Sequence, residues 1–212
     1  MKMGILDIQN LSISYDSRPI LSGFDLSVSK GEKILIKGRS GIGKSTIFRL
    51  IMGFGVQDSG GISMDGVPVD ADNIWDMRKR IAYVSQDTDI GEGKVADLIG
   101  EIFSFKANRG AYEEDDLERI MSDLSLSPRI LNKEFTKLSG GEKQRITLLM
   151  ALLSGKDIFL LDEVTAELDS GLKQKVVEMF FDDPQWTVLA ISHDREWENR
   201  ATKVIDLSGK VD

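Results

Sequence analysis

Apolar and polar residues alternate along the first part of the chain, as they do in strands that are buried on one face. The alternating segments are residues 5–15, 24–29 and, around the turn pair Asp65-Gly66, 62–69. Residues 33–38 form a further strand that runs into a glycine-rich loop, and this loop opens a predicted helix over 44–53. The pattern therefore predicts antiparallel strands combined with one strand–loop–helix unit.

The pattern changes between residues 87 and 137, where apolar residues follow helical spacing. The stretches 95–105 and 115–126 show this spacing most clearly, whereas strands are hard to find. The acidic run 113–116 is expected at a helix N-terminus, where negative charge is favoured, with a solvated surface as its simplest role. We predict an inserted helical region over about 87–137.

Short apolar strands alternate with helices in the remainder of the chain. The predicted strands are 81–84, 158–161, 187–191 and 203–207, and the predicted helices are 141–153 and 171–181. Such alternation favours an α/β fold with a parallel sheet. We expect one domain over residues 1–212, with the helical region as a subdomain.

The composition narrows the class of protein. The chain has 212 residues, of which 41% are hydrophobic and 29% charged, as in ordinary soluble globular proteins. No apolar run approaches the roughly 18 residues that span a bilayer, and no signal peptide is expected at the N-terminus. The absence of cysteine excludes disulfides and thiolate metal sites. A net charge of −8, without a cluster of Lys or Arg, argues against a nucleic-acid partner.

Residues 38–46, GRSGIGKST, match the phosphate-loop pattern G-x-x-x-x-G-K-[ST]. Successive N–H groups of such a loop point at phosphate oxygens, and the following helix adds its positive N-terminal end. Lys44 is expected to reach the β- and γ-phosphates, and the Ser45 hydroxyl to coordinate Mg²⁺. The alternative is a glycine-rich turn that contains Lys-Ser by chance. The predicted nucleotide-binding residues of this loop are Gly38, Arg39, Ser40, Gly41, Ile42, Gly43, Lys44, Ser45 and Thr46.

Two acidic residues end the apolar strand in IFLLDE, residues 158–163. Asp162 is placed to hold Mg²⁺ through water, and Glu163 to polarise an attacking water molecule as a general base. An acidic strand-to-loop turn without a catalytic role is the alternative. The phosphate loop earlier in the chain favours the catalytic interpretation.

The string LSGGEKQR, residues 138–145, exposes a hydroxyl and backbone N–H groups at a predicted helix start. Ser139, Gly140 and Gly141 therefore suit an anion. A chain that already carries a phosphate loop does not need a second phosphate-binding helix for its own nucleotide. This string separates the chain from most other phosphate-loop proteins.

Together these strings and ISHD around His193 resemble the ATP-binding cassette (ABC) ATPase family. The resemblance covers nearly the whole chain, from Tyr15 to the strand after His193. It implies a P-loop NTPase core that binds ATP and Mg²⁺ and hydrolyses ATP, with an N-terminal antiparallel β subdomain and an inserted α-helical subdomain. It also implies a head-to-tail pair of subunits, expected as a homodimer with ATP at the interface. Ser139, Gly140 and Gly141 of one subunit then contact the γ-phosphate held by the other.

The resemblance gives roles to three further residues. His193 matches the switch histidine that touches the γ-phosphate and helps to position the water, and a structural histidine is the alternative. Gln86 matches the glutamine loop, which links Mg²⁺ and the water to the partner-contacting helical region. Tyr15 matches the aromatic residue that stacks on adenine, and a strand aromatic in the core is the alternative.

Residues 165–169, TAELD, resemble the family's interface loop after the catalytic glutamate. Asp169 is retained. Val164 stands where proline is common, Glu167 where a small residue is usual, and Glu142 where glutamine is commonest. These departures concern the interface geometry rather than the ATPase chemistry.

Several branches of the family carry features that this sequence lacks: a long coiled coil, zinc cysteines, a second cassette or membrane helices. The sequence therefore favours a cassette that docks on a separate integral-membrane permease at the cytoplasmic face of the membrane. The run from 138 to 207 also resembles the compact ATPase subunits of metal (iron) export systems. The alternative is a soluble ABC ATPase that acts on a nucleic-acid or protein assembly. Trp75, Trp186 and Trp197 are expected to be packing residues.

Overall fold

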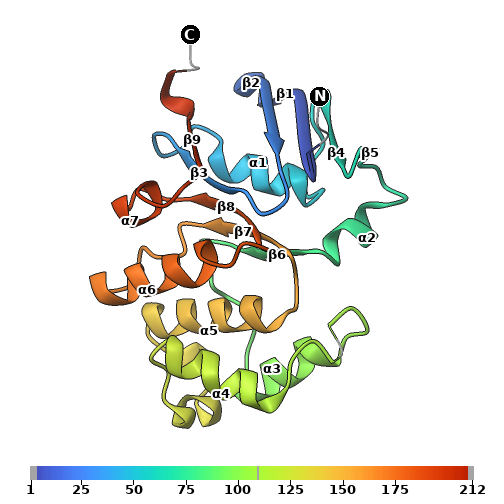
Figure 1. The fold of residues 1–212 in the computed structure, drawn as a ribbon. Coiled ribbons are helices and arrows are strands. Elements are labelled where there is room, and N and C mark those ends of the chain that lie inside the picture. The colour runs from blue at the N-terminus through green and yellow to red at the C-terminus, as the bar shows by residue number, and fades with distance from the viewer. Residues whose placement is uncertain (1–3, 109, 210–212) are drawn as a thin grey trace.

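The computed structural model describes residues 4–108 and 110–209, and its strands form two sheets (Figure 1). The first sheet is antiparallel, in the order β2-β1-β4-β5. Its strands are β1 (Leu6–Tyr15), β2 (Arg18–Val28), β4 (Ser59–Met64) and β5 (Val67–Pro68). The Asp65-Gly66 pair joins β4 to β5 with positive φ at both residues, so the predicted hairpin turn is confirmed.

The second sheet is parallel and has the strand order β6-β7-β8-β3-β9. Its strands are β3 (Lys33–Lys37), β6 (Ile81–Val84), β7 (Ile158–Asp162), β8 (Thr187–Ile191) and β9 (Lys203–Asp206). Every residue of β7 and β8 is buried. A parallel sheet that is covered on both faces requires this, which explains why these strands are continuous apolar runs in the sequence.

Alternate residues of the parallel sheet belong to different cores. Ile34 and Ile36 of β3 pack with helix α1 (Lys44–Ile51) and the antiparallel sheet. Leu35, between them, packs with the core that contains α5 (Gly140–Leu153) and α6 (Ser170–Phe181). Figure 1 shows the two layers, with α1 above the parallel sheet and α5 and α6 below it.

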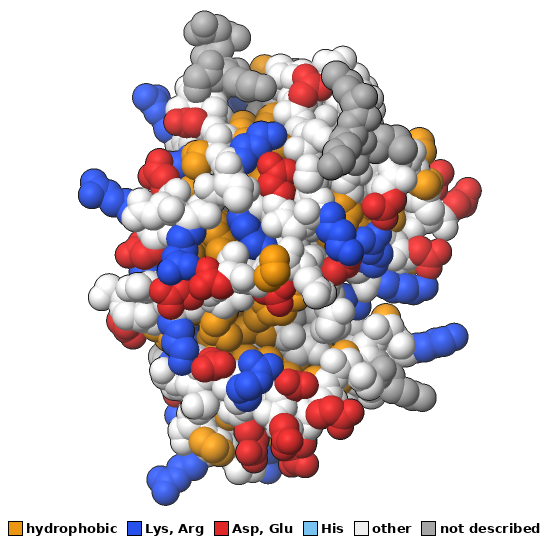
Figure 2. All heavy atoms as spheres, in the orientation of Figure 1, with side chains coloured by type: hydrophobic (Ala, Val, Ile, Leu, Met, Phe, Trp, Pro, Cys, Tyr) orange, Lys and Arg blue, Asp and Glu red, His pale blue; other side chains and the backbone are white. Residues whose placement is uncertain are grey.

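The segment predicted to be helical contains α3 (Val95–Ser104), α4 (Glu114–Asp123) and the 3₁₀ helices η1 (Pro128–Asn132) and η2 (Phe135–Lys137). Glu113 directly precedes α4, so the acidic run lies at a helix N-terminus, as predicted. On the face shown in Figure 2, acidic side chains gather over α3 and α4. The region packs on α5, where the Arg145 guanidinium donates a hydrogen bond of 2.9 Å to the Ser125 carbonyl.

Three short elements were not predicted: α2 (Ile74–Arg78), α7 (Arg195–Glu198) and η3 (Leu207–Gly209). Elements of three to five residues are too short for a periodic pattern to be visible. Trp75, which was expected to be a packing residue, is 68% exposed and stacks on the Arg78 guanidinium, whereas Trp197 is buried. Within the described residues, no helix has the length and apolar character needed to cross a bilayer.

Candidate functional site

The phosphate loop connects the end of β3 to the start of α1. Gly43, the residue before α1, has φ of 101°, and a Cβ atom there would lie 2.8 Å from the Ile20 side chain. A glycine is therefore required at this position. No side chain caps α1, so the N–H groups of its first turn remain available to an anion.

Lys44 is buried, and its ammonium group is held inside the loop. Its Nζ donates hydrogen bonds of 2.8 Å to the Gly38 carbonyl and 3.2 Å to the Arg39 carbonyl. Both acceptors are neutral backbone carbonyls, so these contacts do not neutralise the positive charge of Lys44. An anion that enters the loop would find this charge already in place.

Asp162 ends β7 beneath the phosphate loop, and its carboxylate interacts with the Ser45 hydroxyl. Burial raises the pKa of Asp162, against smaller lowering effects of Ser45 and Lys44. Its Oδ1 has no hydrogen-bond partner among the described residues. A carboxylate, a hydroxyl and the Gln86 amide are hard oxygen donors beside one cavity, so these side chains fit Mg²⁺.

Glu163 and His193 face each other at the rim of the same cavity, with 3.5 Å between Glu163 Oε1 and His193 Nε2. Burial raises the pKa of Glu163, and the smaller electrostatic effects of His193 and Lys44 oppose it. Glu163 has φ of 52°, an uncommon conformation for a residue other than glycine. A half-buried carboxylate beside a phosphate loop can accept a proton from water.

The cavity has a volume of about 440 Å³ and brings together residues from five separate parts of the sequence. Its lining residues are Tyr15, Ile20, Ser40, Gly41, Gly43, Lys44, Ser45, Thr46, Gln86, Asp162, Glu163 and His193. Tyr15 is 50% exposed, which argues against a place in the core. Ile20 was not predicted, because an apolar residue in a strand gives no sequence signal for a site.

Some predicted loop residues lie outside this cavity. Arg39 and Ile42 line an adjacent cavity of about 530 Å³, together with Ser40 and Gly41. Gly38 lines neither cavity, and its carbonyl accepts a hydrogen bond from Lys44. The loop therefore borders two neighbouring cavities along the same edge of the parallel sheet.

The predicted residues Ser139, Gly140, Gly141 and Asp169 are not among those that line the main cavity. Ser139 caps α5 in a capping box: its Oγ accepts from the Glu142 N–H at 3.3 Å, and the Glu142 carboxylate accepts from the Ser139 N–H at 3.0 Å. The hydrogen bond from the Ser139 N–H, followed by the one from the Lys133 ammonium, lowers the pKa of Glu142 to about 2. The start of α5 is therefore rigidly formed away from the phosphate loop of the same chain.

Asp169 caps α6, where its Oδ1 accepts from the Leu172 N–H at 3.0 Å. A Cβ atom on Gly141 would lie 3.0 Å from the Glu167 carbonyl oxygen, so the segments 139–141 and 165–169 lie against each other. Both segments present exposed residues. Together they form one continuous surface beside the cavity, rather than part of its wall.

Comparisons with known proteins identify sequences and structures similar to this chain. The family model described as ABC transporter matches residues 21–166. The energy-coupling factor transporter ATP-binding protein EcfA1 of Ligilactobacillus salivarius (strain UCC118) is 34% identical over 215 residues, which cover 98% of this chain and 76% of that protein. EcfA1 of Streptococcus pyogenes serotype M1 is also 34% identical, over 90% of this chain and 71% of that protein.

Solved structures show the same fold. A bacterial Atm1-family ABC exporter with ATP bound is 25% identical, with a TM-score of 0.84 over 97% of this chain and 38% of the exporter chain. The dimeric ABC transporter cassette MJ0796 is 24% identical, with a TM-score of 0.83 over 96% of this chain and 94% of that chain. Its post-hydrolysis dimer with ADP and phosphate gives a TM-score of 0.82. The predicted fold class is confirmed, while the narrower likeness to metal-export subunits stays a prediction.

Proposed function

The chain belongs to the ABC transporter family, and from this premise we propose how its residues bind Mg·ATP, hydrolyse it and pass the energy to a permease. It is an ATP-binding and ATP-hydrolysing subunit of a transporter. The residue roles, the metal ion, the partners and the location constitute the proposal. One observation carries it: Glu163 and His193 meet 3.5 Å apart beside the cavity that Lys44 and Ser45 also line.

The nucleotide lies with its triphosphate in the phosphate loop and its adenine against Tyr15. Lys44 neutralises the β- and γ-phosphates, while N–H groups of the loop and of the first turn of α1 bind their oxygens. Ser45, Asp162 and Gln86 would hold Mg²⁺, and the bound ion would stabilise the charge that develops on the phosphates. The unpartnered Oδ1 of Asp162 supports this assignment, because it supplies an acceptor that the protein does not use.

Hydrolysis uses Glu163 as the general base. A water oxygen attacks the γ-phosphorus, the bond from that phosphorus to the β–γ bridging oxygen breaks, and a proton of the water moves to Glu163. His193 hydrogen-bonds the γ-phosphate and helps to position the water that Glu163 activates. The raised pKa of Glu163 supports the role of a base, since a more basic carboxylate accepts a proton more readily.

A second subunit, in a homodimer, completes the site. Ser139, Gly140 and Gly141 lie at the N-terminus of a 14-residue helix and outside the cavity of their own chain. We assign them to the γ-phosphate bound by the partner, with Asp169 at the same interface. The dimers of the related cassette MJ0796 support a paired arrangement.

The permease contacts the region beside Gln86. There, β6, the segment 85–90 and the C-terminal half of α5 surround a cavity of about 280 Å³. Phe54 and Trp75, two large aromatic residues that are 52% and 68% exposed, both stack on the Arg78 guanidinium close to β6. We place the protein at the cytoplasmic face of the membrane through this contact.

A pull-down of tagged Glu163→Gln protein from detergent-solubilised native cells with Mg·ATP tests the proposal. Removing the base while keeping the shape of the side chain should trap the ATP-bound dimer on its partner. The expected result is a multi-span membrane protein, absent when Lys44→Ala protein is used as the nucleotide-binding control. Recovery of ribosomal or DNA-bound partners alone would reject the transport part and leave the ATPase chemistry standing.

A further inference from the structure

The segments that carry Glu163 and His193 are joined by a group of hydrogen bonds around the buried Thr165 hydroxyl. We propose that Thr165, Lys173, Asp194 and Trp197, called the Thr165 bracket below, position His193 against Glu163 for hydrolysis. Thr165 and Trp197 are then positioning residues, since neither lines the cavity. This inference rests on the proposed function of Glu163 and His193.

The Thr165 hydroxyl is the centre of the bracket. It donates a hydrogen bond of 2.7 Å to Asp194 Oδ2 and accepts one of 3.0 Å from the Trp197 indole N–H. The other carboxylate oxygen of Asp194 forms a 2.8 Å ion pair with Lys173. The bracket therefore joins the loop after Glu163, the helix α6 and the segment that contains His193.

Burial gives these bonds their strength. Thr165 is fully buried and Trp197 is 1% exposed. In such surroundings a hydrogen bond is strong, and an unpaired donor or acceptor is costly. Valine would fill the space of Thr165 equally well, so packing alone does not explain a hydroxyl at this position.

His193 is not oriented by packing, because its side chain is 58% exposed and its Nε2 contacts Glu163 Oε1 at 3.5 Å. Its orientation depends on the backbone on either side. Ser192 is buried, and its hydroxyl accepts from the Asp194 N–H at 3.0 Å. The Glu163 N–H donates to the Ile191 carbonyl at 2.9 Å. This backbone bond joins the two segments before His193 in the chain, and the Thr165 bracket joins them after Glu163. The two segments that carry Glu163 and His193 are therefore held together at both ends of the contact.

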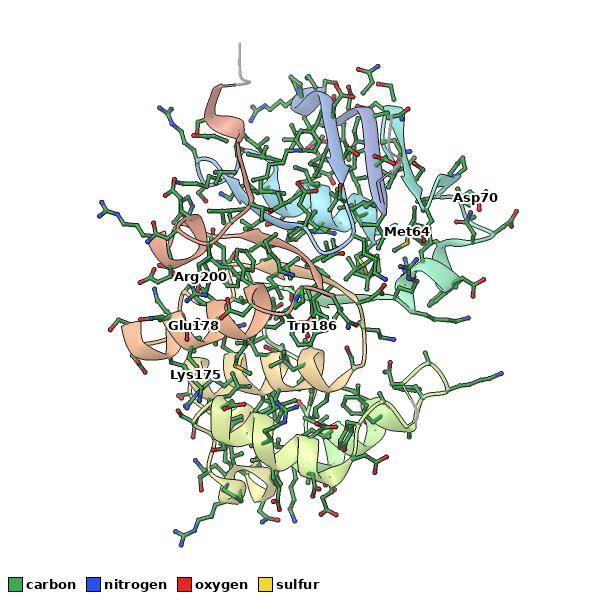
Figure 3. All side chains as sticks on the ribbon, viewed as in Figure 1. Met64, Asp70, Lys175, Glu178, Trp186 and Arg200 are labelled. Atoms are coloured by element: carbon green, nitrogen blue, oxygen red, sulfur yellow. The ribbon has the colours of Figure 1, made fainter. Side chains whose placement is uncertain are left out.

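The helix α7, which carries Trp197, is fixed by three further contacts. The Trp197 ring packs edge-on against Phe181 of α6, with 5.0 Å between ring centroids. Arg200 pairs with Glu178 of α6 at 2.9 Å, and both side chains are labelled in Figure 3. Glu198 pairs at 2.9 Å with Lys37, the residue before Gly38 of the phosphate loop. The position of His193 is thereby coupled to the phosphate loop as well as to Glu163.

Steady-state ATP hydrolysis by Thr165→Val, Thr165→Ser and Thr187→Val proteins tests the bracket. Thr187 is a matched control, since it is buried, lies at the opposite end of β8 and accepts one backbone hydrogen bond of 2.9 Å. We expect Thr165→Val to lower kcat roughly 10- to 100-fold with the KM for ATP within about twofold, because a displacement of about 1 Å at a catalytic group has effects of this size. Thr165→Ser should restore kcat to within about threefold. Thr187→Val should lower the melting temperature and leave kcat within about twofold.

The imidazole signal of His193 in an NMR spectrum gives a readout that lost stability would not change. His193 is the only histidine of the chain, so the signal is unambiguous. It should shift or broaden in Thr165→Val protein, and remain in place in Thr165→Ser and Thr187→Val proteins. If Thr165→Val protein does not fold, Trp197→Phe removes the indole donor while keeping a ring, and the same change is expected.

A normal kcat in folded Thr165→Val or Trp197→Phe protein would overturn the bracket. An unchanged His193 signal in the same variant would overturn it as well. An equal loss of kcat in Thr187→Val protein would also reject it, because the effect would then follow from stability. The proposed function fails separately. If Glu163→Gln protein keeps full turnover, the hydrolysis site is wrong, whereas an inactive Glu163→Gln protein beside a fully active Thr165→Val protein rejects only the bracket.

Discussion

Replacing Glu163 by glutamine is the most direct perturbation of the proposed chemistry. Glutamine keeps the size of the side chain, but it cannot accept the proton of the attacking water. A general base contributes about 10²- to 10⁴-fold to a rate, which corresponds to about 3–5 kcal/mol of transition-state stabilisation. We expect kcat to fall by this factor while ATP still binds and an ATP-bound dimer accumulates. Phosphate release at saturating Mg·ATP measures the rate, and size-exclusion chromatography measures the dimer.

The pH dependence gives an independent check on the same residue. Glu163 acts as a base only when it is deprotonated, and burial raises its pKa above the ordinary value of a glutamate. The rate of the native protein should therefore fall as the pH drops through a pKa above the usual glutamate range. The residual rate of Glu163→Gln protein should not show this fall at low pH.

Glu118→Gln is a matched control, because Glu118 is an exposed glutamate of α4 outside the cavity. Its rate should equal that of the native protein. The assignment of Glu163 as base would be refuted by a Glu163→Gln protein that retains a third or more of native turnover. The assignment would also be refuted if the rate of that variant still fell at low pH in the same way as the native rate.

Three further variants test the remaining roles. Tyr15→Ala should raise the KM for ATP by about 5- to 100-fold, the range of one lost stacking contact, while Tyr15→Phe should keep it; ATPase titrations distinguish the two. Ser45→Ala should raise the Mg²⁺ concentration for half-maximal ATPase activity roughly tenfold or more, with recovery in Ser45→Thr protein, as expected when a metal ligand is removed and restored. Asp162→Asn should abolish hydrolysis, yet raise the melting temperature at neutral pH, because an ionised carboxylate with an unpartnered buried oxygen is removed. Since burial raises the folded-state pKa of Asp162, the native protein should lose stability as the pH rises from the ordinary aspartate pKa to the raised one, and Asp162→Asn should lack that component.

The sequence predicted the parallel sheet well because its strands are buried on both faces. The strand predicted at 187–191 has the same bounds in the structure, and the one predicted at 158–161 extends by one residue to Asp162. The prediction for β2 was poorer: residues 24–29 were expected, whereas the strand starts at Arg18. The hairpin before it turns at Asp16-Ser17, with positive φ at both residues. That pair lacks the glycine that marks such turns in a sequence, so the first half of β2 was missed.

The candidate site was also predicted only in part from the sequence. Motif spacing places Lys44 and Ser45 at the start of the helix after the phosphate loop and Glu163 directly after a strand, and all three line one cavity. Spacing does not reveal contacts between residues far apart in the sequence. The bond from Trp197 to Thr165 joins residues 32 positions apart, and a lone tryptophan in a sequence indicates only burial. The bracket therefore becomes visible only in the folded chain, where β7 and β8 lie side by side.

Polar groups without a protein partner are found at the edge of the sheet where the phosphate loop lies. The helix α1, which follows this loop, has no side-chain cap at its N-terminus. Among the described residues, two buried side-chain atoms lack a hydrogen-bond partner: Asp162 Oδ1, beneath the loop, and Gln144 Nε2, in the α5 helix that begins with Gly140 and Gly141. Native proteins satisfy almost all such groups, so exceptions indicate sites where something else binds. A triphosphate with its cation supplies what this edge lacks: oxygens for the free N–H groups of α1, negative charge for Lys44, and a positive partner for Asp162.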